Sequence, residues 1–130
     1  MERTFLPRAA GPLLERLLEV FPVVAVMGAR QVGKSTLVRH LPALKGYLYL
    51  SLDDLDLRLQ AEADPRVLLE RGDRLILDEV QRVPELLLAI KRSVDEARIP
   101  GRFVLTGCAH RLLYAHLGET LTGRTAQLVL

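Results

Sequence analysis

Residues 23–35 read VVAVMGARQVGKS, and the interpretation of the whole chain starts from this stretch. Its first five residues form a continuous apolar run, which is typical of a strand buried on both faces of a parallel sheet. A glycine-rich segment follows, and then Leu37, Val38 and Leu41 return to helical spacing. The stretch therefore predicts a buried strand, a glycine-rich turn and a helix in succession.

The turn from Gly28 to Ser35 matches the pattern G-x-x-x-x-G-K-[ST] in full, and it has the strand–helix setting that a P-loop needs. In such a loop the backbone N–H groups point inward at a phosphate, and the start of the helix adds partial positive charge. We expect Lys34 to reach the β and γ phosphates of ATP and the Ser35 hydroxyl to coordinate Mg²⁺. The residues expected to hold the nucleotide are Gly28, Ala29, Arg30, Gln31, Val32, Gly33, Lys34, Ser35 and Thr36. The alternative is a turn that merely joins strand to helix, which a full match in this setting disfavours.

Strand and helix patterns alternate along the rest of the chain. Apolar or aromatic runs predict further strands, and helical spacing predicts helices between them. The predicted strands are 23–27, 47–52, 75–77, 103–105 and 127–130. Residues 55–63 fit either a strand or a helix, and we favour a helix. The pattern predicts an α/β fold, a three-layer sandwich around a mainly parallel five-stranded sheet.

Composition limits the classes of protein that remain. The 130 residues fit a single domain, 1–130, with 49% hydrophobic residues for its core. Cys108 is the only cysteine, which excludes an internal disulfide framework and favours a reducing, cytoplasmic location. No apolar run is long enough to cross a membrane. The formal net charge is +2 without a Lys/Arg block, so support for a nucleic-acid partner is weak.

Two adjacent carboxylates follow the third predicted strand. Leu75-Ile76-Leu77 runs into Asp78 and Glu79, which is the form of a Walker B segment. We expect Asp78 to orient a water on Mg²⁺ and Glu79 to polarise the water that attacks the γ-phosphate. The alternative for Asp78 is a helix cap.

Two further residues are weaker candidates for the same chemistry. Thr106, at the end of the fourth strand, can hydrogen-bond the γ-phosphate or the attacking water, or satisfy local backbone instead. Arg124 is a candidate for the cation that stabilises transition-state charge, a role for which Arg30 competes. Asp53 and Asp54 either approach the site from the second strand or cap a helix.

Taken together, these residues resemble a family of bacterial and archaeal P-loop ATPases of the AAA/STAND-like kind. The resemblance is carried by residues 28–37, by Leu77-Asp78-Glu79-Val80-Gln81 with Pro84-Glu85-Leu86, and by residues 101–107 with Gly123-Arg124. It implies the strand order 5-1-4-3-2 and a catalytic role for Glu79. Similar proteins continue into a C-terminal domain of unknown function, so we expect this chain to be the N-terminal ATPase portion of a longer protein. Cys108 and His110 depart from the residues common there, which weakens any sensor role for the loop after Thr106.

These observations favour an Mg²⁺-dependent ATPase whose cycle drives a conformational or assembly switch. A GTP switch is disfavoured because guanine recognition normally uses an N-K-x-D segment and the sequence contains no asparagine. A small-molecule kinase is less favoured, since side-by-side acidic residues suit activation of water. The remaining alternative is a nucleotide-binding scaffold without turnover. Self-association or a protein partner, through a C-terminal region, stays open.

Overall fold

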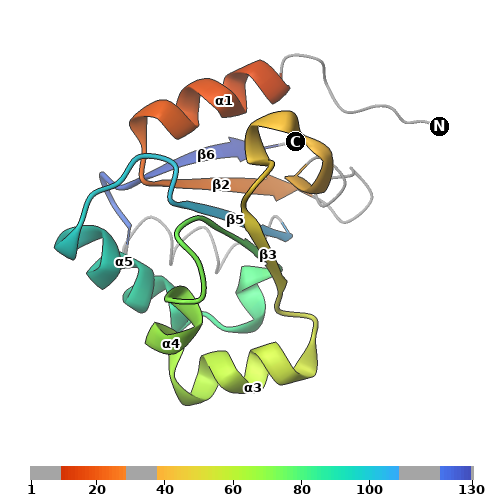
Figure 1. The fold of residues 1–130 in the computed structure, drawn as a ribbon, viewed down its shortest axis with the longest axis vertical. Helices are drawn as coiled ribbons and strands as arrows, with labels where there is room; N and C mark the ends of the chain where they lie inside the picture. Colours follow the sequence, from red (N-terminus) through yellow and green to blue (C-terminus); the bar gives the residue numbers. More distant parts are fainter. Residues whose placement is uncertain (1–9, 29–37, 109–120, 130) are drawn as a thin grey trace.

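A computed structural model of the chain describes residues 10–28, 38–108 and 121–129. Its centre is a five-stranded sheet in which each paired strand is parallel to its neighbour (Figure 1). The strands are β2 (Val23–Gly28), β3 (Leu48–Ser51), β4 (Leu75–Asp78), β5 (Phe103–Cys108) and β6 (Thr125–Val129). The sequence of β2 is continuously apolar, and the strand is buried at all six positions, as expected for a strand inside a parallel sheet.

The order of the strands across the sheet is β3-β4-β5-β2-β6. If the strands are numbered 1 to 5 along the chain and the sheet is read from β6, the order is 5-1-4-3-2, as the family resemblance implied. The predicted α/β class and parallel five-stranded sheet are therefore confirmed. The bounds of every strand differ from the predicted ones by one to three residues at one end or both. The last strand begins at Thr125 rather than at residue 127, so that Arg124 directly precedes it.

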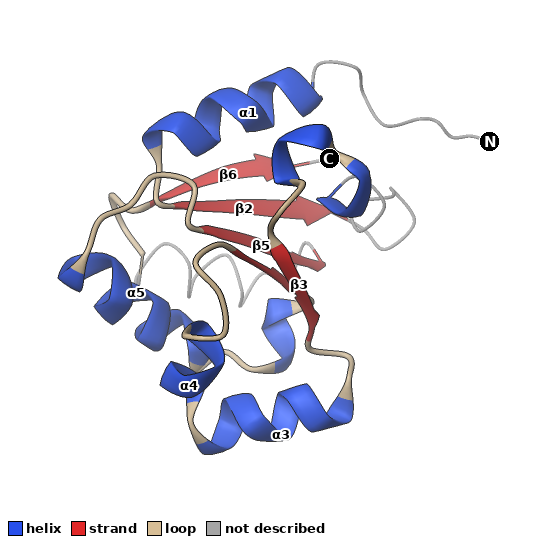
Figure 2. Cartoon of the chain, in the orientation of Figure 1, coloured by secondary structure: helices blue, strands red, loops and turns tan. Residues whose placement is uncertain are grey.

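Helices cover both faces of the sheet (Figure 2). On one side lie α1 (Ala10–Val20) and the short helix η2 (Pro42–Leu44), and on the other lie α3 (Leu55–Ala63), α4 (Pro65–Leu69) and α5 (Leu86–Glu96). A further short helix, η3 (Val80–Arg82), follows β4. The ambiguous segment 55–63 is helical, as predicted, and Asp54 caps it by accepting the N–H groups of Asp56 and Leu57. Helical spacing of Leu112, Leu113 and Leu117 also predicts a helix, and these residues lie outside the described residues.

Two hydrophobic cores separate these three layers. Because side chains alternate along a strand, Val24 and Val26 of β2 face α1, while Val23, Ala25 and Met27 face the layer of α3, α4 and α5. The same alternation places Ile76 of β4 on the α1 side. Apolar side chains therefore cover both faces of the sheet, and polar functional groups are expected at the ends of the strands.

Parallel pairing gives the sheet two distinct ends. We call the end that holds Gly28, Ser51, Asp78 and Thr106 the carboxyl end, and the end where the strands begin the amino end. In open parallel sheets, ligands bind in the crevice outside the carboxyl ends of the strands. No helix within the described residues is long and apolar enough to cross a membrane.

Candidate functional site

Asp78 stands at the carboxyl end of β4 and is held by hydroxyl groups from both neighbouring strands. The Thr106 hydroxyl of β5 donates to Asp78 Oδ1, and the Tyr49 hydroxyl of β3 donates to Asp78 Oδ2. Both donors are neutral, so they orient the carboxylate without cancelling its charge. These two hydroxyl groups thus fix the orientation of the Asp78 carboxylate, and Asp78 is not the cap of η3, whose N-cap residue is Glu79.

Burial sets the predicted residues of this region apart. Within the ranges that the structure describes, the buried polar or charged side chains are Asp78, Glu79 and Thr106, with exposed fractions of 5%, 5% and 0%. Burying a carboxylate costs free energy unless it is hydrogen-bonded or paired. Three of the predicted site residues are therefore buried together, and a buried polar cluster of this kind requires an explanation.

The register of the strands explains how these groups meet. Leu77 of β4 lies opposite Leu105 of β5, so Asp78 and Thr106 come one step later on adjacent strands. Ser51 lies opposite Asp78 and Tyr49 opposite Ile76, which makes Tyr49 a diagonal neighbour of Asp78. The side chains of Asp78, Thr106 and Tyr49 accordingly lie on the sheet face that carries Ile76, which is the face covered by α1.

Glu79 follows with an unusual backbone conformation. Its φ of 58° and ψ of 50° are left-handed, which non-glycine residues seldom adopt and which often marks a functional turn. Its N–H donates to Thr106 Oγ1 over 3.1 Å. The turn sends the chain into η3, and Gln81 Nε2 then donates to Glu79 Oε1 over 2.9 Å.

Tyr49 was not among the residues predicted from the sequence. Burial, and then its bond to Asp78, raise the pKa of the Tyr49 hydroxyl, so this group remains a donor at all ordinary pH values. The Arg39 guanidinium lies 5.2 Å from the centre of the Tyr49 ring. A signal for Tyr49 existed in the expected strand order, since it sits two residues before the end of the strand beside β4.

The residues predicted to hold the phosphates are only partly visible. Gly28 is buried at the carboxyl end of β2. Residues 29–36, including the predicted contacts Ala29, Arg30, Gln31, Val32, Gly33, Lys34, Ser35 and Thr36, lie outside the described residues. Their roles stay predictions. The chain nevertheless leaves β2 at the end of the sheet where Asp78 lies.

Arg124 is not brought together with the other candidates. It directly precedes β6, and its carbonyl accepts the N–H of Val23 at the amino end of β2. Its guanidinium pairs with Asp95 at 2.8 Å. Since β2 rises about 3.3 Å per residue, Arg124 is separated from the carboxyl end by roughly 16 Å of strand. Any role of Arg124 in this chain's own site is therefore disfavoured, and a role in a neighbouring subunit's site stays a prediction.

Of the two aspartates after β3, Asp54 follows the capping alternative and Asp53 does not. Asp54 caps α3, and Asp53 pairs with Arg82 at 3.0 Å. This ion pair links the turn after β3 to η3, and therefore helps to fix the segment that carries Gln81.

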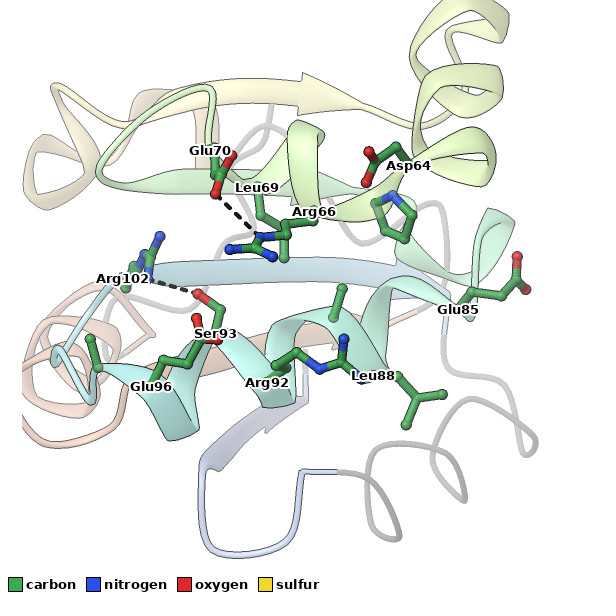
Figure 3. A pocket seen from close by; sticks show the side chains of 13 residues that line it. Asp64, Arg66, Leu69, Glu70, Glu85, Leu88, Arg92, Ser93, Glu96 and Arg102 are labelled. Carbon is green, nitrogen blue, oxygen red and sulfur yellow. Dashed lines mark hydrogen bonds and ion pairs between the residues drawn. The ribbon is translucent and has the colours of Figure 1, made fainter.

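A separate cavity of about 410 Å³ lies between α4 and α5 (Figure 3). Arg102 donates to Ser93 over 2.8 Å and Arg66 pairs with Glu70 at 3.5 Å along its lining. It contains none of the predicted site residues, and its helices pack on the sheet face opposite Asp78. The candidate site is therefore the polar cluster at the carboxyl end rather than this cavity.

Fold and site together define a class. The chain is a three-layer α/β protein with a parallel sheet in the order β3-β4-β5-β2-β6 and an acidic pair where β4 ends. Comparison with known proteins then identifies the family: a family profile described as an AAA domain matches residues 20–130, so the chain belongs to the AAA domain family.

Two curated relatives have the same degree of similarity. The uncharacterized protein Mb2031c of Mycobacterium bovis and the uncharacterized protein Rv2008c of Mycobacterium tuberculosis are each 34% identical over 118 residues. The match covers 90% of this chain and 26% of each relative, so the chain spans about a quarter of their length.

Solved structures show the same fold at lower identity. The Walker-type ATPase paby2304 of Pyrococcus abyssi aligns with a TM-score of 0.66 and 21% identity, over 96% of this chain and 53% of that one. Saccharomyces cerevisiae RIF2 aligns with a TM-score of 0.55 and 12% identity, over 99% of this chain and 56% of that one.

Proposed function

We propose that residues 1–130 form one ATPase domain that binds ATP with Mg²⁺ and hydrolyses it to ADP and phosphate. The observation that carries the proposal is the burial of Asp78, Glu79 and Thr106 together at the carboxyl end of the sheet. A cluster of this kind, beside the strand that leads into a full P-loop motif, suits phosphoryl transfer to water. The cycle would drive a conformational or assembly switch in a cytoplasmic protein, with a second copy or another protein as partner.

The donor set around Asp78 fits Mg²⁺. Magnesium takes oxygen ligands and keeps several waters, and the groups gathered here are a carboxylate and two hydroxyls. Each Asp78 oxygen accepts one of these hydroxyl groups, so the carboxylate is held in one orientation. Asp78 and Ser35 would hold the ion, which when bound neutralises charge on the β and γ phosphates.

Within this proposal the side chains divide the work. Lys34 and the amides of residues 28–36 bind the phosphates, and Thr106 fixes both Asp78 and the backbone of Glu79. Glu79 orients a water whose oxygen bonds to the γ-phosphorus while the bond from that phosphorus to the β–γ bridging oxygen breaks. ADP leaves with the electron pair, and the water proton passes to the Glu79 carboxylate.

A nucleotide-binding scaffold is the second candidate, and the position of Arg124 favours it. With Arg124 at the amino end, this residue contributes no cation to its own chain's site. An isolated chain that needs an arginine from a neighbour would bind ATP and turn over slowly. The chain also spans only about a quarter of its curated relatives, so the activity of a longer protein is itself part of the proposal.

Glu79→Gln and Lys34→Ala separate these candidates. For an ATPase, Glu79→Gln retains ATP binding and loses about 10²- to 10⁴-fold in turnover. Lys34→Ala loses ATP binding with an unchanged circular-dichroism spectrum. Turnover absent from both wild type and Glu79→Gln, with ATP bound by both, supports the scaffold. Unaltered ATP affinity in Lys34→Ala contradicts nucleotide binding by the P-loop.

A further inference from the structure

Gln81 is held close to Glu79 by the shape of the chain between them. The left-handed conformation of Glu79 turns the backbone sharply, and the N–H of Arg82 bonds back to the Glu79 carbonyl over 3.0 Å. This single turn of η3 carries the Gln81 amide to the Glu79 carboxylate. The contact is therefore a product of a constrained local fold and not of two mobile side chains that meet by chance.

The segment that carries Gln81 is anchored on both sides. Val80 and Val83 are fully buried in the core against α3, α4 and α5. Between them, Arg82 pairs with Asp53 in the turn after β3. Because the backbone is fixed at these points, the bond from Gln81 Nε2 selects one orientation of the Glu79 carboxylate.

The other end of the same amide has an unmet requirement. Gln81 Oε1 is buried and has no hydrogen-bond partner among the described residues. Buried polar atoms are nearly always satisfied, so an exception needs an explanation. Reversing the amide would place its oxygen against the Glu79 carboxylate, where two acceptors repel, so the orientation that leaves Oε1 open is the favourable one.

A water that attacks phosphorus beside Glu79 would supply the hydrogen-bond donor that Gln81 Oε1 lacks. Such a water has two hydrogens, and Glu79 accepts only one of them. The Gln81 amide donates to Glu79 through Nε2, and its acceptor Oε1 lies next to that donor. The second hydrogen of the water would therefore be donated to Gln81 Oε1, beside the same carboxylate.

We propose that Gln81 is a positioning residue for hydrolysis: its Nε2 aims Glu79, and its Oε1 accepts the second hydrogen of the attacking water. The inference rests on the proposed ATPase function. Gln81 exchanges no proton and forms no covalent bond in the reaction. Its contribution is to fix two hydrogen bonds of the water, so that the oxygen lone pair faces the γ-phosphorus.

Three variants test this role in the whole protein with Mg²⁺ and ATP. Gln81→Met keeps the size and removes both polar atoms, and Gln81→Glu keeps an acceptor but removes the donor. We expect either change to lower kcat by about 10- to 100-fold while KM and ATP affinity stay unchanged. The control is Gln60→Met, since Gln60 is an exposed glutamine of α3 that contacts Arg71, and it should leave kcat unaltered.

A double-mutant cycle distinguishes positioning from a structural role. If Gln81 acts through Glu79, Gln81→Met causes no further loss of kcat in a Glu79→Gln background. A purely structural residue would instead lower Tm and multiply the loss in both backgrounds. Should Gln81→Met fail to fold, Gln81→Glu carries the same comparison with its length and polarity retained.

Specific results would overturn the inference without touching the proposed function. A wild type that hydrolyses ATP in a Glu79-dependent manner, with kcat of both Gln81 variants within about twofold of wild type, contradicts it. Losses that are fully multiplicative in the Glu79→Gln background contradict it as well. Absent turnover in the wild type overturns the proposed function, and this inference falls with it.

Discussion

The two ends of the sheet differ in how they accommodate charged side chains. At the carboxyl end, Asp78 is buried and accepts hydroxyl bonds from Tyr49 and Thr106. At the amino end, Arg124 and Asp95 form an ion pair whose side chains are 24% and 49% exposed. The ion pair at the amino end is therefore in contact with water, while the Asp78 carboxylate at the carboxyl end is enclosed in the protein.

The difference indicates which end is specialised for chemistry. An exposed ion pair contributes little to stability, and its loss is easily tolerated. A buried carboxylate such as Asp78 is costly, because its interactions within the protein must offset its lost hydration. The proposed phosphate site would account for the position of Asp78 at the end of the sheet where β2 leads into the P-loop pattern.

Among the changes that compare the two ends of the sheet, the largest effect is expected for Asp78→Asn. An amide offers one acceptor where the carboxylate offers two, so either Tyr49 or Thr106 would face an N–H₂ group. We expect ATP hydrolysis to fall by about 10²- to 10³-fold and the Mg²⁺ concentration for half-maximal rate to rise. Steady-state kinetics at varied Mg²⁺ measure both. Asp95→Asn is the matched control at the amino end, and equal losses in the two variants would remove the distinction between the ends.

The next effect concerns two tyrosines close together in sequence. Tyr49→Phe removes the hydroxyl that orients Asp78 and leaves the ring in place beside Arg39. Loss of a group that orients a metal ligand typically costs about 10- to 100-fold in metal affinity or activity. We therefore expect a shift of that size in the Mg²⁺ dependence, measured as above.

Tyr47→Phe is the matched control for this change. The Tyr47 hydroxyl donates to the Gly101 carbonyl at the amino end, so its loss affects only folding, by about 1 kcal/mol in the free energy of unfolding. Denaturant unfolding with parallel kinetics separates the two variants. A Mg²⁺ dependence that responds equally to both would contradict the assigned difference.

These contrasts also show which parts of the site the sequence could predict. Asp78 and Thr106 were identifiable because each directly follows a strand that the sequence predicts, and the ends of neighbouring parallel strands lie together. Tyr49 escaped because its contact depends on the diagonal register between β3 and β4, which apolar pattern does not define. Gln81 was quoted as part of a motif, but its contact requires the left-handed turn at Glu79, which a non-glycine sequence does not announce.

The position of Arg124 depends on where the final strand lies in the sheet. The sequence placed the final strand at 127–130, whereas β6 starts at Thr125 and pairs in parallel with β2. A residue that directly precedes a parallel strand must lie at the amino end. The fold itself was predictable further than this, because buried strands and a complete P-loop pattern point to one class, and the resemblance supplied the strand order.

Gly101→Ala probes the packing of the amino end. Gly101 has a φ of +71°, and an added Cβ would lie 2.9 Å from the Leu18 carbonyl oxygen. We expect a loss above the roughly 1 kcal/mol that a left-handed alanine costs alone. Gly123→Ala gives that baseline, since Gly123 has a φ of +77° with no atom within 4 Å of the added Cβ. Equal changes in the free energy of unfolding would contradict the close contact.

The smallest effect is expected for Arg124→Ala. The bond from Arg124 holds the pKa of the Asp95 carboxyl below its ordinary value. The pair therefore stabilises the fold above the ordinary pKa of an aspartate, and this contribution is lost as pH falls through the lowered pKa. In Arg124→Ala, NMR titration of Asp95 should show its pKa returning upward. An unchanged Asp95 pKa would contradict the ion pair.

The location of the nucleotide can be measured directly with ATP and Mn²⁺ in place of Mg²⁺. Paramagnetic broadening of backbone amide signals falls steeply with distance from the ion. The account predicts strong broadening of Asp78 and Thr106, with Leu75, Phe103 and Thr125 at the amino end affected least. Broadening that is greatest at the amino end, or absent from Asp78 and Thr106 while ATP is bound, would contradict a phosphate site at the carboxyl end of the sheet.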